Sequence, residues 1–238
     1  MNSKALGTTF SIAFVLAVPS VLVAQEKFSS PEQAGQSLFA AVEKNDRSRI
    51  AEILGRKELA SSGDEAQDQA DLKLFAEKYH EMHRLHRDAS GARILYVGAE
   101  NWPFPVPLVY KAGSWQFDPD AGAEEILYRR IGENELAAIA YCRNLAAPKD
   151  VAARAELPES LATLQPGSPA VLVSGYNFRI LAGGAVIAYP AEYRSSGVMS
   201  FAVATNGTVY ERDLGPNTAQ IASAMSAFHR NAAWRAAD

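Results

Sequence analysis

Residues 101–138 read NWPFPVPLVYKAGSWQFDPDAGAEEILYRRIGENELAA, and this stretch decides what kind of fold the chain forms. Its first part, WPFPVPLVY at residues 102–110, alternates apolar side chains with Pro103, Pro105 and Pro107. Alternation with a period of two predicts a strand, and prolines two residues apart remove the N–H donors from one side of it. We therefore expect an edge strand at residues 102–110.

A second strand and a long helix are predicted directly after this edge strand. Residues 112–114 (AGS) indicate a turn, and residues 115–117 (WQF) the returning strand. The pattern then becomes helical from about residue 121 to residue 145, with Asp118 or Asp120 as the capping residue. A strand pair followed by a helix is typical of an α+β chain.

Three helices are predicted before the strands. Ser30 and Pro31 have the residue types that cap and start a first helix, and a shorter helix is expected at residues 46–54. Residues 66–87 predict a third helix, and an apolar run at residues 94–97 predicts a strand. The stripe that indicates the third helix consists of Leu72, Phe75, Ala76, Tyr79 and Met82.

The chain after residue 145 has a different composition. Residues 146–170 are rich in Ala and Pro and are interpreted as a linker. Residues 171–238 predict a β-meander, with Asn206-Gly207 as its clearest hairpin turn. A last helix is expected from Pro216, with Ile221, Ala224, Met225 and Phe228 on one face.

These patterns predict an α+β fold in two segments. Residues 28–145 would form N-terminal helices with a small antiparallel sheet. Residues 171–238 would form an antiparallel β-meander closed by a C-terminal helix.

Residues 1–24 have the pattern of a signal peptide. Lys4 is their only charged residue, and an apolar run at residues 10–18 is followed by Pro19. Cleavage after Ala24 would leave a chain that starts at Gln25 and has no stable membrane span. The alternative is an uncleaved anchor helix, because residues 5–24 are nearly long enough to cross a bilayer. We expect a periplasmic or secreted protein.

Charge and cysteine content exclude several classes of protein. Without residues 1–24 the chain has 22 basic and 27 acidic residues, which argues against nucleic acid and against anionic membranes as partners. Cys142 is the only cysteine, so an intrachain disulfide and a cysteine-based metal site are both excluded. We interpret Cys142 as an ordinary helix residue.

Two long stretches carry a family resemblance. Residues 101–138, quoted above, and residues 188–215 (AYPAEYRSSGVMSFAVATNGTVYERDLG) resemble the DUF2950 family of exported bacterial proteins. The opening SPEQA at residues 30–34 and the SSGD at residues 61–64 extend the similarity. The resemblance implies no activity and therefore no catalytic residues. The meander also resembles, by shape alone, the sheet of pilin-like proteins.

Histidines are the first candidates for chemistry. His80, His83 and His86 fall within one predicted helical segment, YHEMHRLH, where His83 and His86 lie in the apolar stripe and His80 beside it. Shared metal ligation, proton transfer and hydrogen bonding at the edge of a core are all compatible with this spacing. A metal site usually needs a further ligand from elsewhere in the chain, and the sequence indicates none. We therefore favour hydrogen-bonded histidines at the edge of a core and expect no metal site.

Two further sets of residues are candidates for binding. Arg129 and Arg130 could bind a carboxylate or phosphate, although a solvated helix face paired with neighbouring glutamates explains them as well. Trp102 begins an aromatic set that could line a ligand pocket or form core. The other members of this set are Phe104, Tyr110, Trp115 and Phe117.

The sequence favours a non-enzymatic module that binds an envelope protein or a small ligand, without a cofactor. No stretch has the motif of a serine hydrolase or a phosphate-binding loop. One alternative is a hydrolase-like enzyme with a small pocket that uses His83 and nearby carboxylates. Another is a pilin-like secretion or surface component, which would need an uncleaved N-terminal helix.

Overall fold

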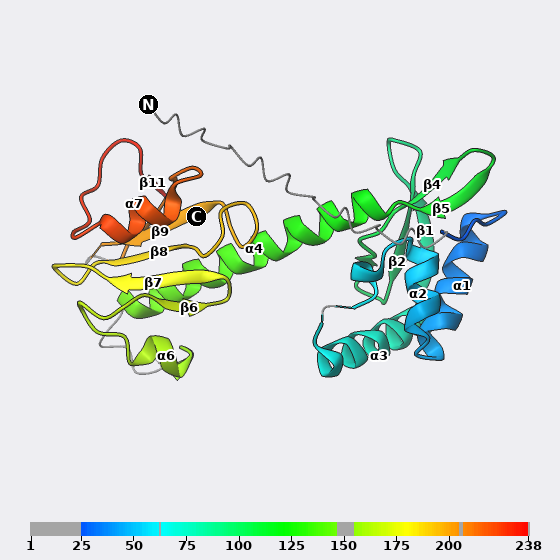
Figure 1. Cartoon of the computed structure of the whole chain (residues 1–238), viewed down its shortest axis with the longest axis horizontal. Coiled ribbons are helices and arrows are strands. Elements are labelled where there is room, and N and C mark those ends of the chain that lie inside the picture. Colours follow the sequence, from blue (N-terminus) through cyan, green and yellow to red (C-terminus); the bar gives the residue numbers. More distant parts are fainter. Residues whose placement is uncertain (1–24, 62, 147–154, 205–206, 238) are drawn as a thin grey trace, which may run out of the picture. The chain divides into compact units, whose positions relative to one another are not determined.

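The computed structural model describes residues 25–61, 63–146, 155–204 and 207–237, and it confirms the α+β class. The predicted signal peptide at residues 1–24 lies outside this part of the chain. Two compact units are present (Figure 1). Among the described residues, the first contains those up to Trp102 and Leu108–Phe117, and the second contains Pro103–Pro107 and those from Asp118 onward.

The first unit begins with helices whose starts are fixed by local capping. Ser30 accepts a hydrogen bond from the Gln33 backbone N–H and caps α1, and Asp46 caps α2 through the Arg49 N–H. Gly55 ends α2 in the left-handed conformation that favours glycine. The helices are α1 (Pro31–Glu43), α2 (Arg47–Leu54), the short 3₁₀ helix η1 (Lys57–Leu59) and α3 (Glu65–Glu81).

The strands of the first unit form one antiparallel sheet. They are β1 (His83–Arg87), β2 (Arg93–Val97), β3 (Trp102–Pro103), β4 (Leu108–Lys111) and β5 (Ser114–Phe117). The order is β1-β2-β4-β5, and β3 pairs with β2. The core of this unit is made by buried side chains from helices and strands, among them Leu38, Ile53, Leu95, Val97, Leu108 and Phe117.

The third helix is shorter than its sequence pattern predicts. Residues 83–87, expected as its last turns, form β1 instead and pair with β2 over five residues. After Met82 the sequence HRLHR contains one apolar residue, Leu85, so a helix there would bury almost nothing. As a strand it places Leu85 opposite buried Leu95.

The proline-rich strand is also shorter than predicted. Residues 102–110 do not form one continuous strand, because β3 ends at Pro103 and β4 begins at Leu108. Pro105 and Pro107 lie in the gap, where the missing N–H groups cannot complete a ladder.

The second unit is a long helix with a six-stranded antiparallel sheet. The helices are α4 (Pro119–Ala146), α6 (Glu159–Ala162) and α7 (Thr218–Ala224). The strands are β6 (Val171–Val173), β7 (Tyr176–Ile180), β8 (Val186–Pro190), β9 (Met199–Val203), β10 (Val209–Asp213) and β11 (Arg235–Ala236). Their order is β11-β10-β9-β8-β7-β6, which is the predicted meander extended by β11.

Both faces of this sheet are covered, with α4 on one and α7 on the other (Figure 1). On the α4 face Phe178, Ala188 and Phe201 pack with Cys142, and on the α7 face Ile187 and Ala202 pack with Ala222. Alternate residues of β8 and β9 belong to opposite clusters, as the period of a strand requires.

Segments flanking the meander differ in detail from their sequence patterns. Leu157, Leu161 and Leu164, within the stretch interpreted as a linker, are buried in the α4-side core. At the other end α7 stops at Ala224, before the apolar face that was expected to continue to Phe228. Among the described residues β11 follows α7, so a C-terminal helix that closes the meander is not clearly shown.

Candidate functional site

A hollow of about 430 Å³ lies in the first unit, beside α2 and η1. It has the size of many small-molecule pockets, which span roughly 300–1,000 Å³. Its walls combine charged, hydroxyl and methyl groups. The lining residues are Arg47, Ser48, Ala51, Glu52, Lys57, Ala60 and Ser61.

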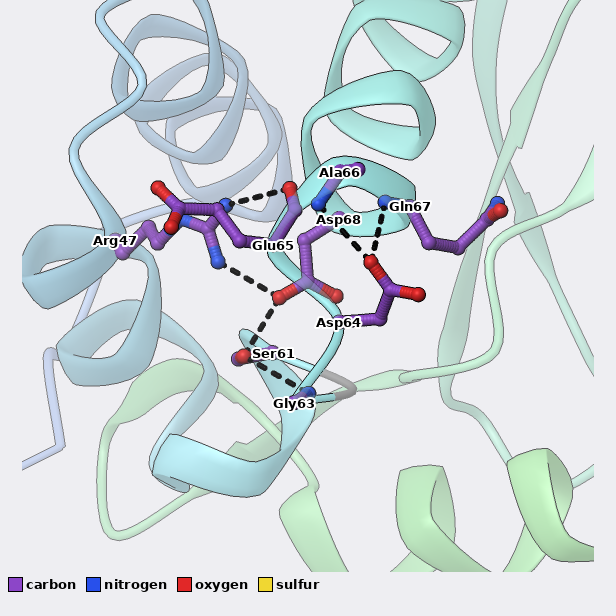
Figure 2. Close-up of polar contacts among 8 residues, drawn as sticks. All are labelled: Arg47, Ser61, Gly63, Asp64, Glu65, Ala66, Gln67 and Asp68. Carbon is purple, nitrogen blue, oxygen red and sulfur yellow. Dashed lines mark hydrogen bonds and ion pairs between the residues drawn. The ribbon is translucent and has the colours of Figure 1, made fainter.

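A buried carboxylate contacts two of these lining residues, Arg47 and Ser61 (Figure 2). Asp68 in the first turn of α3 is only 7% exposed. Its Oδ2 accepts hydrogen bonds from Arg47 Nη1 at 2.7 Å and from Ser61 Oγ at 2.6 Å. A buried carboxylate is costly unless it is paired and hydrogen-bonded, and here both conditions are met.

Local capping places the three groups. Asp46 caps α2 and so makes Arg47 its first residue, while Asp64 accepts from the Ala66 and Gln67 N–H groups and caps α3 (Figure 2). Asp68 lies one turn after Asp64, and its carboxylate reaches Arg47 at the start of α2. Ser61 Oγ is held in turn by the Gly63 N–H at 3.2 Å.

The cluster connects three segments that are separate in sequence. Arg47 Nη1 contacts Asp68, and Nη2 lies 3.5 Å from the Glu65 carbonyl oxygen. The guanidinium is thus fixed against α3 while its side chain lines the hollow. Lys57 contributes an exposed ammonium to the same wall, and Glu52 is engaged by Arg49 at 2.9 Å. The arrangement can bind a small polar molecule with an acidic group.

Of the histidines proposed from the sequence, His83 and His86 lie on β1 and not on a helix. His83 stacks on Tyr79 with ring centroids 4.0 Å apart, and its Nδ1 is 3.0 Å from the Tyr79 carbonyl oxygen. His86 makes an edge contact with Tyr96. On α3, His80 Nε2 lies 3.1 Å from a Glu43 oxygen.

Tyr79 is the centre of this aromatic stack. Its ring lies between Phe39 and His83, parallel to both within 9°. Burial raises the pKa of the Tyr79 hydroxyl. These contacts are of the kind that stabilises packing between α1, α3 and β1.

The remaining predicted residues fall in different units. Trp102 belongs to the first unit and is 46% exposed. Arg129 and Arg130 belong to α4 in the second unit. Arg129 pairs with Glu125 at 2.7 Å and donates to the Pro103 carbonyl oxygen at 2.9 Å.

Sequence reasoning did not single out Arg47, Ser61 or Asp68. One signal was available, because Asp68 lies four residues before Leu72 and extends the apolar stripe of α3 toward its start. A charged residue on an apolar stripe requires a buried partner. The family resemblance included the SSGD loop but gave Ser61 no role.

The thiol of Cys142 is fully buried among the apolar residues of the second unit. Desolvation raises its pKa well above the ordinary range of a thiol. A thiol in this state is poorly nucleophilic, which agrees with its interpretation as a packing residue.

The described residues also bear on metal binding and on membrane insertion. They contain no group of three or more His, Cys, Asp or Glu side chains arranged to hold a metal ion. Within the same part of the chain, no helix has both the length and the apolar character needed to cross a membrane.

Comparison with known proteins identifies a family. No curated protein and no solved structure matches the chain. The family described as "Protein of unknown function (DUF2950)" matches residues 25–157 and 170–237, which is most of the sequence. The resemblance noted in the two long stretches is thereby confirmed, and the chain belongs to the DUF2950 family.

Proposed function

We propose that this protein is an exported, non-enzymatic binding module whose ligand site is the hollow beside α2 and η1. The observation that carries the proposal is the buried Asp68 carboxylate, held by Arg47 and Ser61 in the wall of that hollow. An apolar residue would pack at this position without the cost of burying a charge. The cluster instead fixes two polar side chains at a concave surface.

The wall indicates a small, polar ligand. Lys57 supplies positive charge and Ser48 and Ser61 supply hydroxyl groups. The charge of Arg47 is balanced by Asp68, and that of Glu52 by Arg49. Ala51 and Ala60 offer small apolar contacts on the same surface. We infer a ligand with an acidic or hydrogen-bonding group and a compact body. A segment of an envelope protein that presents such a group is the second form this ligand could take.

Export is supported by the sequence of residues 1–24, with a single charge, an apolar run and a small residue at position 24. The ordered fold of the first unit includes Gln25, the residue that cleavage would expose. We propose that the mature protein acts in the periplasm or outside the cell.

A non-enzymatic role is supported by how the candidate nucleophiles and bases are used. His83 stacks on Tyr79, and Cys142 is buried in the core of the second unit. Ser61 donates a hydrogen bond to Asp68, which also binds Arg47, so this carboxylate holds two neighbouring side chains in place. These groups stabilise structure where they lie.

Filling the hollow tests the proposed site. Ser48 is exposed on α2 and lines the hollow, so Ser48→Trp should occupy it without disturbing the core. Gln36→Trp on the exposed face of α1 is the matched control. Small molecules released on denaturation of wild type and control, but absent from Ser48→Trp, would support the proposal. Equal release from all three proteins would contradict it.

A further inference from the structure

The side chain of Gln25 is inserted into the fold of the first unit. Its Nε2 donates to the Phe117 carbonyl oxygen at 2.5 Å, and its Oε1 accepts from Gln116 Nε2 at 3.4 Å. The amide also lies against Gly55, where an added Cβ would come within 2.7 Å of Gln25 Cδ. Both ends of the amide are thus held by residues of β5 and by the end of α2.

The residues that follow Gln25 continue this attachment. The Glu26 N–H donates to the Glu52 carbonyl oxygen at 3.1 Å, and Phe28 exchanges two backbone hydrogen bonds with Trp115. Phe28 is 3% exposed. Residues 25–28 are therefore anchored at several points, and Gln25 is not the loose end of a mobile tail.

A glutamine at the start of a chain has a characteristic reaction. Its free α-amine attacks its own Cδ, a bond forms between the α-nitrogen and Cδ, and the bond between Cδ and Nε2 breaks. Ammonia leaves with the proton lost by the amine, and a neutral pyroglutamate ring remains. The side chain must fold back on its own backbone, so a conformation that holds the amide elsewhere prevents ring closure.

We propose that the fold protects Gln25 from this modification, so that the mature protein keeps a charged N-terminal glutamine. The inference rests on the proposed cleavage after Ala24. Ring closure breaks the bond between Cδ and Nε2, and in the folded chain Nε2 is hydrogen-bonded to Phe117 and Cδ lies against Gly55, so both contacts oppose the movement of the amide. Folding therefore determines whether residue 25 remains a glutamine with a free α-amine or becomes pyroglutamate.

Peptide mass spectrometry of the exported full chain tests the inference. Protein recovered after secretion is incubated in native buffer or in urea, and loss of ammonia from the N-terminal peptide is followed with time. Gly55→Ala should displace the Gln25 side chain. Gly63→Ala is the matched control, because Gly63 also has a positive φ but no atom lies within 4 Å of an added Cβ.

We expect the native wild type and Gly63→Ala to retain glutamine, and the urea-treated wild type and Gly55→Ala to cyclise several times faster. Equal rates for the wild type in native buffer and in urea would overturn the inference alone. This comparison stands even if Gly55→Ala fails to fold. A recovered chain that still contains residues 1–24 would overturn the proposed cleavage after Ala24 and, with it, the inference.

Discussion

Gly197 shows how strongly a single residue constrains the second unit. A Cβ at this position would lie 2.1 Å from the Tyr176 hydroxyl oxygen, which donates to the Met199 carbonyl oxygen at 2.8 Å. Tyr176 is fully buried, so its ring has no room to move away. The glycine is required by close approach and not by its backbone angles.

Gly197→Ala should therefore destabilise the second unit by about 3 kcal/mol, the upper end of what overpacking in a core costs. Gly132→Ala is a control with the opposite expected effect on stability, because no atom lies within 4 Å of its added Cβ and the residue is inside α4. It should stabilise the helix by roughly 0.5–1 kcal/mol. Urea denaturation followed by circular dichroism measures both. Equal effects of the two substitutions would contradict the assigned packing.

At the scale of elements, Glu135 connects α4 to the start of β9. Its Oε1 accepts hydrogen bonds from the Val198 and Met199 N–H groups, both at 2.9 Å. These donors lie at the point where the chain enters β9 and have a partner in the carboxylate. One side chain thus satisfies two backbone groups of another element.

Glu135→Ala should destabilise the second unit by about 1–3 kcal/mol, because two partly buried N–H groups lose their acceptor. Glu135→Gln retains an oxygen at the same position and should cost less than half as much. The free energies of unfolding of both variants, measured side by side, check this order. A glutamine variant as unstable as the alanine variant would show that charge, and not the hydrogen bonds, is decisive.

Element prediction succeeded where local residues decide the outcome. The start of α1 at Pro31 and the end of α2 before Gly55 follow from capping chemistry within a few residues. The change from helix to strand at Met82 depends on pairing with β2. The residues of α3 alone do not reveal this pairing. The candidate site was not predicted for the same reason. Asp68 is part of a polar cluster only because it binds Arg47 on another helix.

At the scale of the molecule, each unit has a core of its own. Leu38 and Ile53 pack within the first unit, and Phe178 and Phe201 within the second. Each unit should therefore have its own free energy of unfolding, and a substitution should change the stability of the unit that contains it.

Arg47→Ala tests this division together with the polar cluster. Removing the guanidinium takes Arg47 away from the buried Asp68 carboxylate, a loss of about 3 kcal/mol or more. Hydrogen exchange read by mass spectrometry should show faster exchange in peptides of the first unit. Peptides of β7 to β9 should not change. Uniformly faster exchange would contradict the assignment of separate cores.

The central claim is that the hollow beside α2 and η1 binds a small ligand in the exported protein. Native mass spectrometry of protein purified gently from the cell envelope tests it most directly. We predict a mass equal to residues 25–238 plus a stoichiometric small adduct in the wild type, and the bare mass in Ser48→Trp. A bare mass in both proteins, or the same adduct in both, would contradict the claim.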